Sequence, residues 1–386
     1  MTPVLVINSG SSSLKFGMFV ERDGDEHAVV RGNADAIGSD NGKLDVHDER
    51  GTVVLSEARR FGSQQEALSY ITGKLAALEY DVPTGIGHRI VHGGPRLVTH
   101  QRITDKVLAT LEQAVHFAPL HIPAAINLVR HTEKLFPGVP QFACFDTAFH
   151  QTMPEAAYHF AIPEKYSAQG IRRYGFHGLS YASIVRSLGR ELPRKTVAAH
   201  LGSGASLAAI ANGKSVDTSM GLTPTGGIPM GTRTGDLDPG VPLFLMRNQK
   251  LDADKLESLL NHDSGLTALG GTNDMRKLQT AASAGDKNAQ LAIEVFCRSI
   301  AKTIASFAAV LGGLDLLVFA GGIGEHSADV RANVCRRLGF LGVKIDEERN
   351  RTSVAVISED ISSVTIRIVP SEEEKQIARE CRALLH

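Results

Sequence analysis

Residues 4–19, which read VLVINSGSSSLKFGMF, predict a β-hairpin at the start of the chain. Residues 4–7 are four consecutive apolar side chains, as in a buried strand, and residues 14–19 alternate as a second strand does. The small polar residues 8–13 between them are typical of a tight turn. Backbone N–H groups at such a turn can approach phosphate oxygens and Lys15 adds a cation, so the turn is either a phosphate loop or a plain hairpin turn. A strand rather than a helix follows it, which excludes the Walker pattern.

A second stretch with the same plan occurs at residues 196–210, which read TVAAHLGSGASLAAI. Ser13-Leu14 and Ser206-Leu207 lie 193 positions apart, which is half of the chain length of 386. Asn212-Gly213 follows directly and favours a type I′ turn into a third strand. The repeat predicts an internal duplication, in which two domains each begin with a hairpin whose turn faces a shared cleft. The alternative is two unrelated glycine-serine turns.

Strand and helix patterns alternate along the rest of the chain, which predicts an α/β architecture. Strands are expected at residues 85–91, 141–145 and 315–319. Helices are expected at residues 64–78, 105–116, 123–135, 286–311, 327–337 and 371–385, with Ser327 and Ser371 as N-caps and Glu374 at the capping-box position of the last helix. We place an N-terminal domain at 1–150, joined by the C-terminal helix 372–386, and a nucleotide-binding domain at 151–371.

The composition excludes several classes of partner. Lys and Arg total 41 and Asp and Glu total 42, a balance that leaves no electrostatic footprint for nucleic acid or an anionic membrane. The four cysteines are widely spaced without a CxxC pair, as buried thiols are in a reducing compartment. No targeting segment or membrane span is recognisable, so the expected location is the cytoplasm.

Three segments of the first half carry candidate site residues. Arg89 lies in HRIVHGG, residues 88–94, where it is either an anion-binding fork or a surface arginine beside core histidines. His121 lies at a predicted helix start, which suits either anion binding or simple capping. Asp146 follows a buried strand, where open α/β sheets hold ligands and metals, although an Asx turn is the commoner use of such a residue.

The second half adds three more segments. His177 lies in YGFHG, residues 174–178, where structural packing is the alternative to contact with a charged group. Arg233 lies in the glycine-rich loop PMGTRTGDLDPG, residues 229–240, whose polarity argues against a role in packing alone. AGGIGE, residues 320–325, predicts a strand, a glycine turn and a helix, and it lacks the third glycine of the dinucleotide fingerprint. Together these segments make up the inventory for phosphoryl transfer.

The ordered set of motifs resembles the acetate kinase family, within the actin, sugar kinase and Hsp70 superfold. The resemblance covers essentially the whole chain and rests on VINSGSSSLKF, HRIVHGG, PLH, FDTAFH, YGFHG, AHLGSGAS, MGTRTGDLDPG, GTNDMR, AGGIGE and the C-terminal EEE. It implies two duplicated actin-like (ribonuclease H-like) domains with an interdomain cleft. It also implies reversible transfer of the ATP γ-phosphoryl group to acetate by direct in-line displacement, which gives acetyl phosphate and ADP.

The resemblance further implies roles for individual residues. Those implied in catalysis are Asp146, Arg89, His177, Arg233 and His121. Those implied in nucleotide binding are Asn8, Ser11, Lys15, His200, Leu201, Gly202, Ser203, Gly204, Asp274, Met275, Arg276, Gly322, Ile323 and Gly324. Those implied in acetate binding are Arg89, Val91, Leu120, Phe176 and Pro224. Asn8 and Glu373 are implied in binding Mg²⁺, with Mn²⁺ as a substitute, and a homodimer is implied as the assembly.

Four positions depart from the family pattern. Ser203 stands where the family commonly has Asn, Ile122 replaces a usual Asn, residues 225–227 read TGG in place of Leu-Glu-Gly, and His326 replaces an Asn. These departures affect the second phosphate loop and the adenosine contacts, and they leave Arg89, His177 and Arg233 in place.

The chemistry needs no general base, because acetate is already ionised at neutral pH, with free carboxylic acids titrating near ~4. It needs relief of the repulsion between two anions, which Arg89, His177 and Arg233 would supply in the transition state. The alternative functions are a propionate or butyrate kinase, an actin-like filament or nucleotide-gated binding protein, and a Rossmann dehydrogenase. The clustered cations disfavour the second, and the missing fingerprint disfavours the third.

Overall fold

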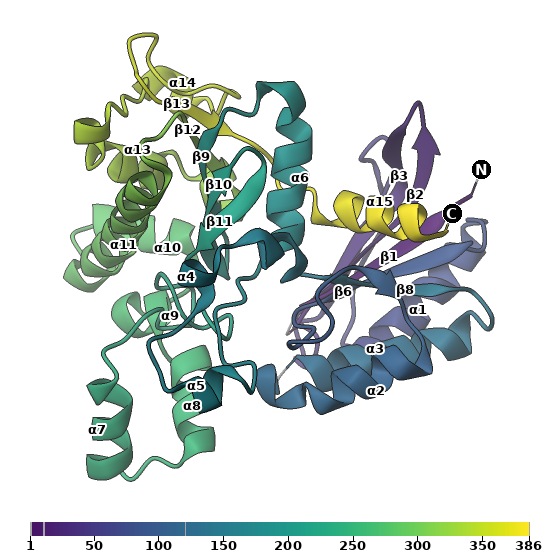
Figure 1. Ribbon diagram of the computed structural model, residues 1–386. Coiled ribbons are helices and arrows are strands. Elements are labelled where there is room, and N and C mark those ends of the chain that lie inside the picture. Colours follow the sequence, from purple (N-terminus) through teal and green to yellow (C-terminus); the bar gives the residue numbers. More distant parts are fainter. Residues whose placement is uncertain (1, 11, 120, 386) are drawn as a thin grey trace. The chain divides into compact units, whose positions relative to one another are not determined.

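The computed structural model describes residues 2–10, 12–119 and 121–385. Ser11 and Leu120 of the predicted site therefore lie outside the described residues. The chain divides into two compact units (Figure 1). The first unit runs to Ala148 and includes the C-terminal segment from Glu372, and the second unit is Phe149–Ser371. No helix in the described residues is both long enough and apolar enough to span a membrane.

The first unit is built on one mixed sheet with the strand order β5-β4-β3-β2-β1-β6-β8-β7. Its strands are β1 (Val4–Ser9), β2 (Leu14–Arg22), β3 (Asp25–Asp35), β4 (Lys43–Asp48), β5 (Val53–Ala58), β6 (Gly85–Ile90), β7 (Gln101–Arg102) and β8 (Gln141–Phe145). Its helices are α1 (Gln64–Ala77), α2 (Asp105–Gln113), the 3₁₀ turn η1 (Val115–Phe117), α3 (Ile122–Leu135) and α15 (Glu373–Leu385).

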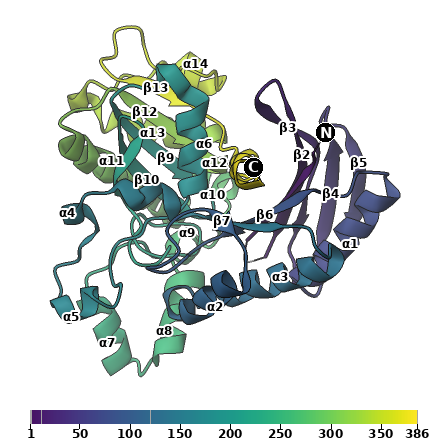
Figure 2. The same ribbon diagram turned by 45° about the vertical axis from the view of Figure 1, so that its right-hand side comes forward.

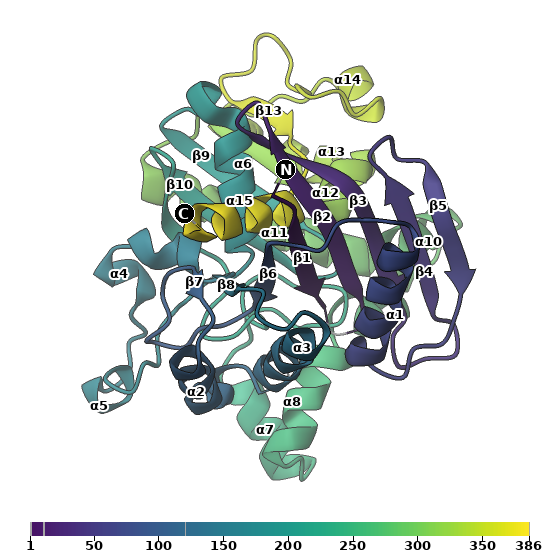
Figure 3. The ribbon, with the colours of Figure 1, turned by 90° about the vertical axis from the view of Figure 1, so that its right-hand side faces the viewer.

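Helices pack on both faces of this sheet (Figure 3), and the side chains of β1 alternate between these two faces. Leu5 and Ile7 point into a core cluster that includes side chains of α1 and α3. On the other face, β1, β6 and β8 contact α15, and an ideal Cβ placed on Gly87 of β6 would lie 2.6 Å from the Ile377 side chain. The helix therefore packs directly against the β6 backbone, which requires a residue without a side chain at position 87.

The second unit is built on a smaller sheet with the order β11-β10-β9-β12-β13. Its strands are β9 (Lys195–Leu201), β10 (Ala205–Ala211), β11 (Lys214–Thr218), β12 (Leu316–Ala320) and β13 (Thr365–Ile368). Its helical elements are η2 (Ala148–Thr152), α4 (Glu155–Tyr158), α5 (Glu164–Ser167), α6 (Gly178–Leu188), η3 (Gly189–Glu191), α7 (Gly240–Asn248), α8 (Ala253–His262), α9 (Gly265–Gly270), α10 (Met275–Ser283), α11 (Lys287–Leu311), α12 (Gly321–His326), α13 (Ala328–Arg336), η4 (Gly339–Leu341) and α14 (Glu347–Arg351). Side chains of α6 pack on the sheet residues of one core cluster, and α11 contacts β9 and β10.

The two units share one strand plan, which confirms the predicted duplication. In each, three consecutive strands form an antiparallel meander: β1-β2-β3 in the first unit and β9-β10-β11 in the second. A fourth strand, β6 or β12, then pairs parallel to the first strand of the unit, and a fifth, β8 or β13, pairs parallel to that fourth strand. Asn212 and Gly213 both have positive φ between β10 and β11, as the predicted type I′ turn requires.

Local signals fixed most helix starts correctly. Asp286 caps α11 and Ser327 caps α13, each by accepting backbone N–H bonds. The prediction that Ser371 caps the last helix with Glu374 is wrong, because α15 begins at Glu373 and the Ser371 hydroxyl donates instead to Ser180 Oγ at 2.9 Å. Strands β3, β4, β5, β7 and β13 and the helices α4–α10 and α14 were not predicted.

Two histidines are part of the cores rather than of an anion site. His88 in β6 and His150 in η2 are each 2% exposed. His88 Nε2 bonds Gln141 Oε1 at 2.7 Å, while His150 contacts Ser215 Oγ at 2.8 Å and the Phe176 carbonyl at 3.0 Å. Burial lowers the pKa of each imidazole to about 4. Both therefore stay neutral in the folded protein at pH values where a free histidine is charged.

These two histidines should make the protein less stable as the pH falls. Their folded pKa is about 4, so between pH 6.5 and 4 the unfolded chain binds more protons than the folded chain. We expect each histidine to lower the free energy of unfolding by about 2 kcal/mol when the pH falls from 7 to 5. Urea unfolding of wild type, His88→Gln and His150→Gln at both pH values measures this. Each variant should lose less stability over that interval than wild type does, and an unchanged pH dependence would contradict the assignment.

Candidate functional site

The first group of predicted residues meets at the carboxyl ends of three neighbouring parallel strands. Asn8 lies near the end of β1, Arg89 near the end of β6, and Asp146 directly after β8. The register pairs Ile7 with His88, so Asn8 and Arg89 are side by side, and the Asp146 amide donates to the Ile90 carbonyl at 3.0 Å. This edge of a parallel sheet is where α/β proteins bind ligands.

Arg89 and Asp146 form an ion pair that leaves little freedom to either side chain. Arg89 donates from Nε to both Asp146 oxygens at 3.1 and 3.0 Å and from Nη2 to Oδ2 at 2.6 Å. Its Nη1 donates to Asn8 Oδ1 at 3.2 Å. Burial alone would lower the pKa of Arg89, but the charges of Asp146 and Glu373 outweigh it and hold that pKa above its usual value. Arg89 is thus a fixed cation, and Asp146, 1% exposed, is held as its carboxylate partner.

The start of α15 adds two more carboxylates to this group. Asn8 Nδ2 donates to Glu373 Oε2 at 3.2 Å and to Glu374 Oε1 at 2.7 Å. Glu374, predicted only as a capping residue, is therefore part of the site. The described residues contain no cluster of three His, Cys, Asp or Glu side chains already arranged around a metal ion. The oxygens of Asn8, Asp146 and Glu373 are nevertheless the hard donors that Mg²⁺ takes one or two at a time.

The remaining predictions for the first unit fall near this edge or beside it. Lys15 pairs with Asn8 across the β1–β2 ladder, and its side chain is exposed. Val91 follows β6 and is half-buried. His121 directly precedes α3, as predicted, without a side-chain capping bond to the helix.

A second group forms in the second unit around two histidines. His200 lies at the end of β9, and His177 precedes α6 in the left-handed region at φ 57°. Their rings stack with centroids 4.5 Å apart. His177 Nδ1 contacts Ser206 Oγ at 2.9 Å, and His200 Nδ1 contacts Ser180 Oγ at 2.8 Å.

The glycine turn 202–204 brings Arg233 to the same place. An ideal Cβ built on Gly204 would lie 3.3 Å from His177 Nε2 and 3.5 Å from Arg233 Nη1. Arg233 also donates to the Pro224 carbonyl at 3.2 Å. Pro224 and Phe176 are both buried, and Phe176 directly precedes His177 in the chain. Two of the predicted acetate-pocket residues therefore adjoin Arg233 and His177.

Close backbone approaches join the predicted nucleotide segments to that turn. Gly321, at φ 74°, opens α12, and an ideal Cβ there would lie 2.8 Å from the Leu201 carbonyl oxygen. The Gly231 amide donates to the Ser203 carbonyl at 3.1 Å, and an ideal Cβ on Gly231 would lie 3.2 Å from Asn273 Cβ. The turns that carry Gly202, Gly322 and Asp274 are therefore packed on one another.

The individual nucleotide residues differ in exposure. Asp274 is the N-cap of α10 and bonds the amide and guanidinium of Arg276, whose side chain is exposed. Met275 is buried, while Ser203 and Gly322 are exposed and Ile323 is partly exposed. Gly324 is buried.

Arg331 is a site-supporting residue that the sequence patterns did not reveal. Its side chain is fully buried and donates to the carbonyls of Gly324 and Glu325 at 2.9 and 2.8 Å. It also donates to Asn350 and Ser353, which are likewise uncharged acceptors. Burial lowers its pKa. No local signal separates it from Arg336, the exposed arginine at the end of α13, because its burial depends on packing against α14.

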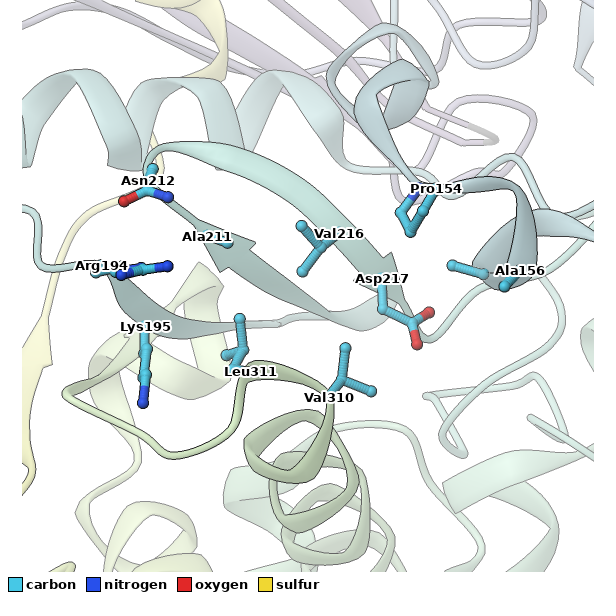
Figure 4. Close-up of a pocket in the computed structure, with 11 residues that line it drawn as sticks. Pro154, Ala156, Arg194, Lys195, Ala211, Asn212, Val216, Asp217, Val310 and Leu311 are labelled. Atoms are coloured by element: carbon cyan, nitrogen blue, oxygen red, sulfur yellow. The ribbon is translucent and has the colours of Figure 1, made fainter.

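A cavity of about 490 Å³ in the second unit lies away from these groups. Figure 4 shows it over β10 and β11, with Arg194 and Lys195 at one end and Asp217 at the other. Lys195 is the first residue of β9, whereas His200 is near the last, so the cavity and the histidine group occupy opposite ends of that strand. It contains none of the predicted site residues.

Duplicated α/β units whose strand ends present fixed cations, imidazoles and glycine turns have the features of a phosphotransferase. The sequence matches the model of the Acetokinase family over residues 3–379. It is 41% identical to an acetate kinase of Treponema denticola, over 99% of both chains. Among solved structures, a propionate kinase of Francisella tularensis superposes with TM-score 0.93 at 36% identity and full coverage of both chains. An acetate kinase of Porphyromonas gingivalis superposes with TM-score 0.88, also at 36% identity and full coverage.

The chain belongs to the acetokinase family. It is a phosphotransferase with a carboxyl group as acceptor, as the sequence resemblance implied. The two-domain α/β fold is likewise confirmed by the likeness to the solved structures.

Proposed function

We propose that this protein is a Mg²⁺-dependent acetate kinase that transfers the γ-phosphoryl group of ATP reversibly to acetate. The observation that carries the proposal is the set of fixed donors in each unit: Arg89 held by Asp146, and His177 beside Arg233 at the glycine turn. An anion that attacks a polyanion needs such positive charges and hydrogen-bond donors, and the family of the chain supplies the reaction class.

The reaction balances without a proton transfer. A carboxylate oxygen of acetate attacks the γ-phosphorus, the bond from that phosphorus to the β,γ-bridging oxygen breaks, and ADP leaves with the electron pair. Arg89, His177 and Arg233 donate to the oxygens on which charge collects during the in-line displacement. His121 is proposed to assist at the same oxygens.

Asp146 is proposed to work through Arg89 rather than as a base. It accepts three hydrogen bonds from the guanidinium, and a carboxylate bound in this way is a poor proton acceptor. Its effect is to hold the guanidinium in one orientation, so that the cation needs no rearrangement when charge develops.

The oxygen donors of Asn8, Asp146 and Glu373 fit Mg²⁺, with Glu374 as a further carboxylate on Asn8. When bound together with the nucleotide, the ion would neutralise phosphate charge. Lys15, Ser11 and the turn of residues 10–13 would contact phosphate oxygens from the first unit. In the second unit, the His200–Gly204 turn, the Gly322–Gly324 turn and Asp274–Arg276 would hold the nucleotide.

Acetate is preferred over propionate in this proposal, because Val91, Leu120, Phe176 and Pro224 match the small methyl pocket of the family motif. One extra methylene is worth only about 1–3 kcal/mol, so some activity with propionate is expected. A propionate kinase among the similar structures makes this the competing assignment.

The function is tested by trapping the product. With ATP, Mg²⁺ and acetate, the protein should release ADP and form acetyl phosphate, which hydroxylamine converts to a coloured hydroxamate. Omission of acetate or of the metal should abolish product. A kcat/KM series over C2, C3 and C4 acids should peak at acetate. A maximum at C3 would reassign the substrate to propionate, and ADP release independent of any acid would contradict kinase function.

The proposed cations are tested by truncation. Arg89→Ala and Arg233→Ala should each lower kcat by about 10²–10³-fold, because each removes a donor to the transition state. Arg130→Ala and Arg336→Ala are matched controls, since both are exposed arginines of the first and second unit respectively, and both should stay within a few fold of wild type. A near-normal kcat for Arg89→Ala or Arg233→Ala would remove that residue from the mechanism.

We also propose that the protein is a homodimer that uses α7 as its contact surface. None of the residues of α7 is buried. Its apolar side chains are among the exposed large hydrophobic residues, namely Val241, Leu243, Phe244 and Met246, with Leu237 just before them. Figure 2 shows α7 beside α8, away from the sheet of its unit. A gathered apolar surface of this kind marks an interaction site, and the same patch on both copies is what a twofold dimer needs.

The dimer proposal is tested by charge insertion. Phe244→Asp should convert a dimer into a monomer in light scattering coupled to gel filtration, because a carboxylate cannot be buried at an apolar contact without a partner. Phe340→Asp is the matched control, since Phe340 is an even more exposed phenylalanine of the same unit outside α7. A monomeric wild type, or a Phe244→Asp dimer, would contradict the proposal.

A further inference from the structure

Two hydroxyl chains lie behind the stacked histidines of the second unit. His177 Nδ1 contacts Ser206 Oγ at 2.9 Å, and Tyr181 OH contacts the same Ser206 Oγ at 2.6 Å. Ser206 and Tyr181 are both fully buried. The sequence patterns assigned no role to either residue, and the mechanism above does not use them.

The second chain has the same form. His200 Nδ1 contacts Ser180 Oγ at 2.8 Å, and Ser371 Oγ donates to Ser180 Oγ at 2.9 Å. The Ser371 amide is itself fixed, because it donates to Glu325 Oε1 at 3.1 Å. The same Glu325 oxygen accepts from the Gly321 amide at 2.9 Å. Ser371 is thus held at its backbone by the glutamate that closes the glycine turn of α12.

The contacts in these chains are compatible with hydrogen bonds that run toward the two histidines. A hydroxyl has a single proton, so a serine that accepts from one neighbour can donate its own proton to the other. A phenol is a stronger acid than an aliphatic hydroxyl, which favours Tyr181 as the donor to Ser206. Ser206 then donates to His177 Nδ1. By the same count, Ser371 donates to Ser180 and Ser180 donates to His200 Nδ1.

Each imidazole that accepts at Nδ1 carries its proton on Nε2 when it is neutral. Both Nε2 atoms face the glycine turn, because ideal Cβ atoms on Gly202 and Gly204 would lie 3.9 Å from His200 Nε2 and 3.3 Å from His177 Nε2. Two charged rings stacked 4.5 Å apart would repel each other. The Arg233 guanidinium beside the turn adds to that repulsion, so two imidazolium ions are disfavoured.

We propose that Tyr181 and Ser371 are positioning residues that act through Ser206 and Ser180 to hold His177 and His200 as neutral Nε2–H donors facing the glycine turn. The link of these donors to phosphoryl transfer rests on the proposed function. The proposed tautomers of His177 and His200 do not depend on the proposed function. If Tyr181 loses its hydroxyl, Ser206 can accept from His177 Nδ1–H, and Nε2 then presents a lone pair where an anion has to bind.

The tautomers are read directly by NMR of protein labelled with ring-¹⁵N histidine, with no substrate present. His177 and His200 signals are assigned by their loss in His177→Gln and His200→Gln. Wild type should show Nε2 protonated and Nδ1 unprotonated for both rings. Tyr181→Phe should shift His177 toward the Nδ1–H form and leave His200 unchanged, and Ser371→Ala should do the reverse. An Nδ1–H form in wild type, or no shift in either variant, would overturn the proposal.

Kinetics provide the second readout. Tyr181→Phe should lower kcat by about 10–100-fold with little change in the KM for acetate, because the donor is lost mainly where charge develops. Tyr174→Phe is the matched control: it removes the hydroxyl of another buried tyrosine, which donates to the Gly170 carbonyl at 2.8 Å outside the two chains. Ser371→Thr keeps a hydroxyl and should recover most of the kcat lost in Ser371→Ala.

The outcomes separate this inference from the proposed function. Equal loss in Tyr181→Phe and Tyr174→Phe, or failure of Ser371→Thr to rescue, would mean a general packing effect and overturn the positioning roles. If wild type forms no acetyl phosphate but shows both Nε2–H tautomers with the expected shifts in the variants, the function assignment fails and the hydroxyl chains stand. Should Tyr181→Phe not fold, Ser371→Ala tests the same logic on His200.

Discussion

The ion pair between Arg89 and Asp146 is the interaction on which the first unit's chemistry depends. Asp146 is almost wholly buried, and an unpaired carboxylate there would be strongly destabilising. The pair forms because β6 and β8 are parallel neighbours, so the end of one strand and the residue after the other meet. Asn8 completes the arrangement by accepting from Arg89 and donating to the two glutamates at the start of α15. The Arg89 guanidinium is therefore oriented before any ligand binds. The entropy cost of ordering this side chain arises during folding and not during ligand binding.

The duplicated topology gives the two units similar strand edges and different chemistry. At the edge of the first sheet, carboxylates and an amide surround one arginine. At the corresponding edge of the second sheet, His200 is near the end of β9, the glycine turn of α12 follows β12, and serine hydroxyls contact His177 and His200. The first unit thus offers oxygen donors suited to a hard cation, whereas the second offers N–H groups suited to anions.

In the second unit, polar side chains away from the reacting groups fix the positions of the glycine turn and the two histidines. Arg331 fixes the carbonyls that end the glycine turn of α12, and Glu325 ties the amide of Gly321 to that of Ser371. The hydroxyls of Ser206 and Ser180 occupy the Nδ1 atoms of the two histidines. In a low-dielectric interior such bonds are strong when every member is satisfied, so a network of this kind specifies one geometry for the groups that it supports.

The sequence alone determined the duplicated hairpins, the α/β alternation and the family, because these follow from local turn chemistry, period-two burial and ordered motifs. It also singled out Arg89, Asp146, His177 and Arg233 as candidate site residues. It did not determine that Ser371 bonds Ser180, that Glu374 joins Asn8, or that Arg331 is buried beneath a glycine turn. It also did not separate His88 and His150, which serve the cores, from His177 and His200, which face the turn. Those distinctions were decided only by tertiary structure, because the partner of each side chain comes from a distant segment that packing alone brings within hydrogen-bonding distance.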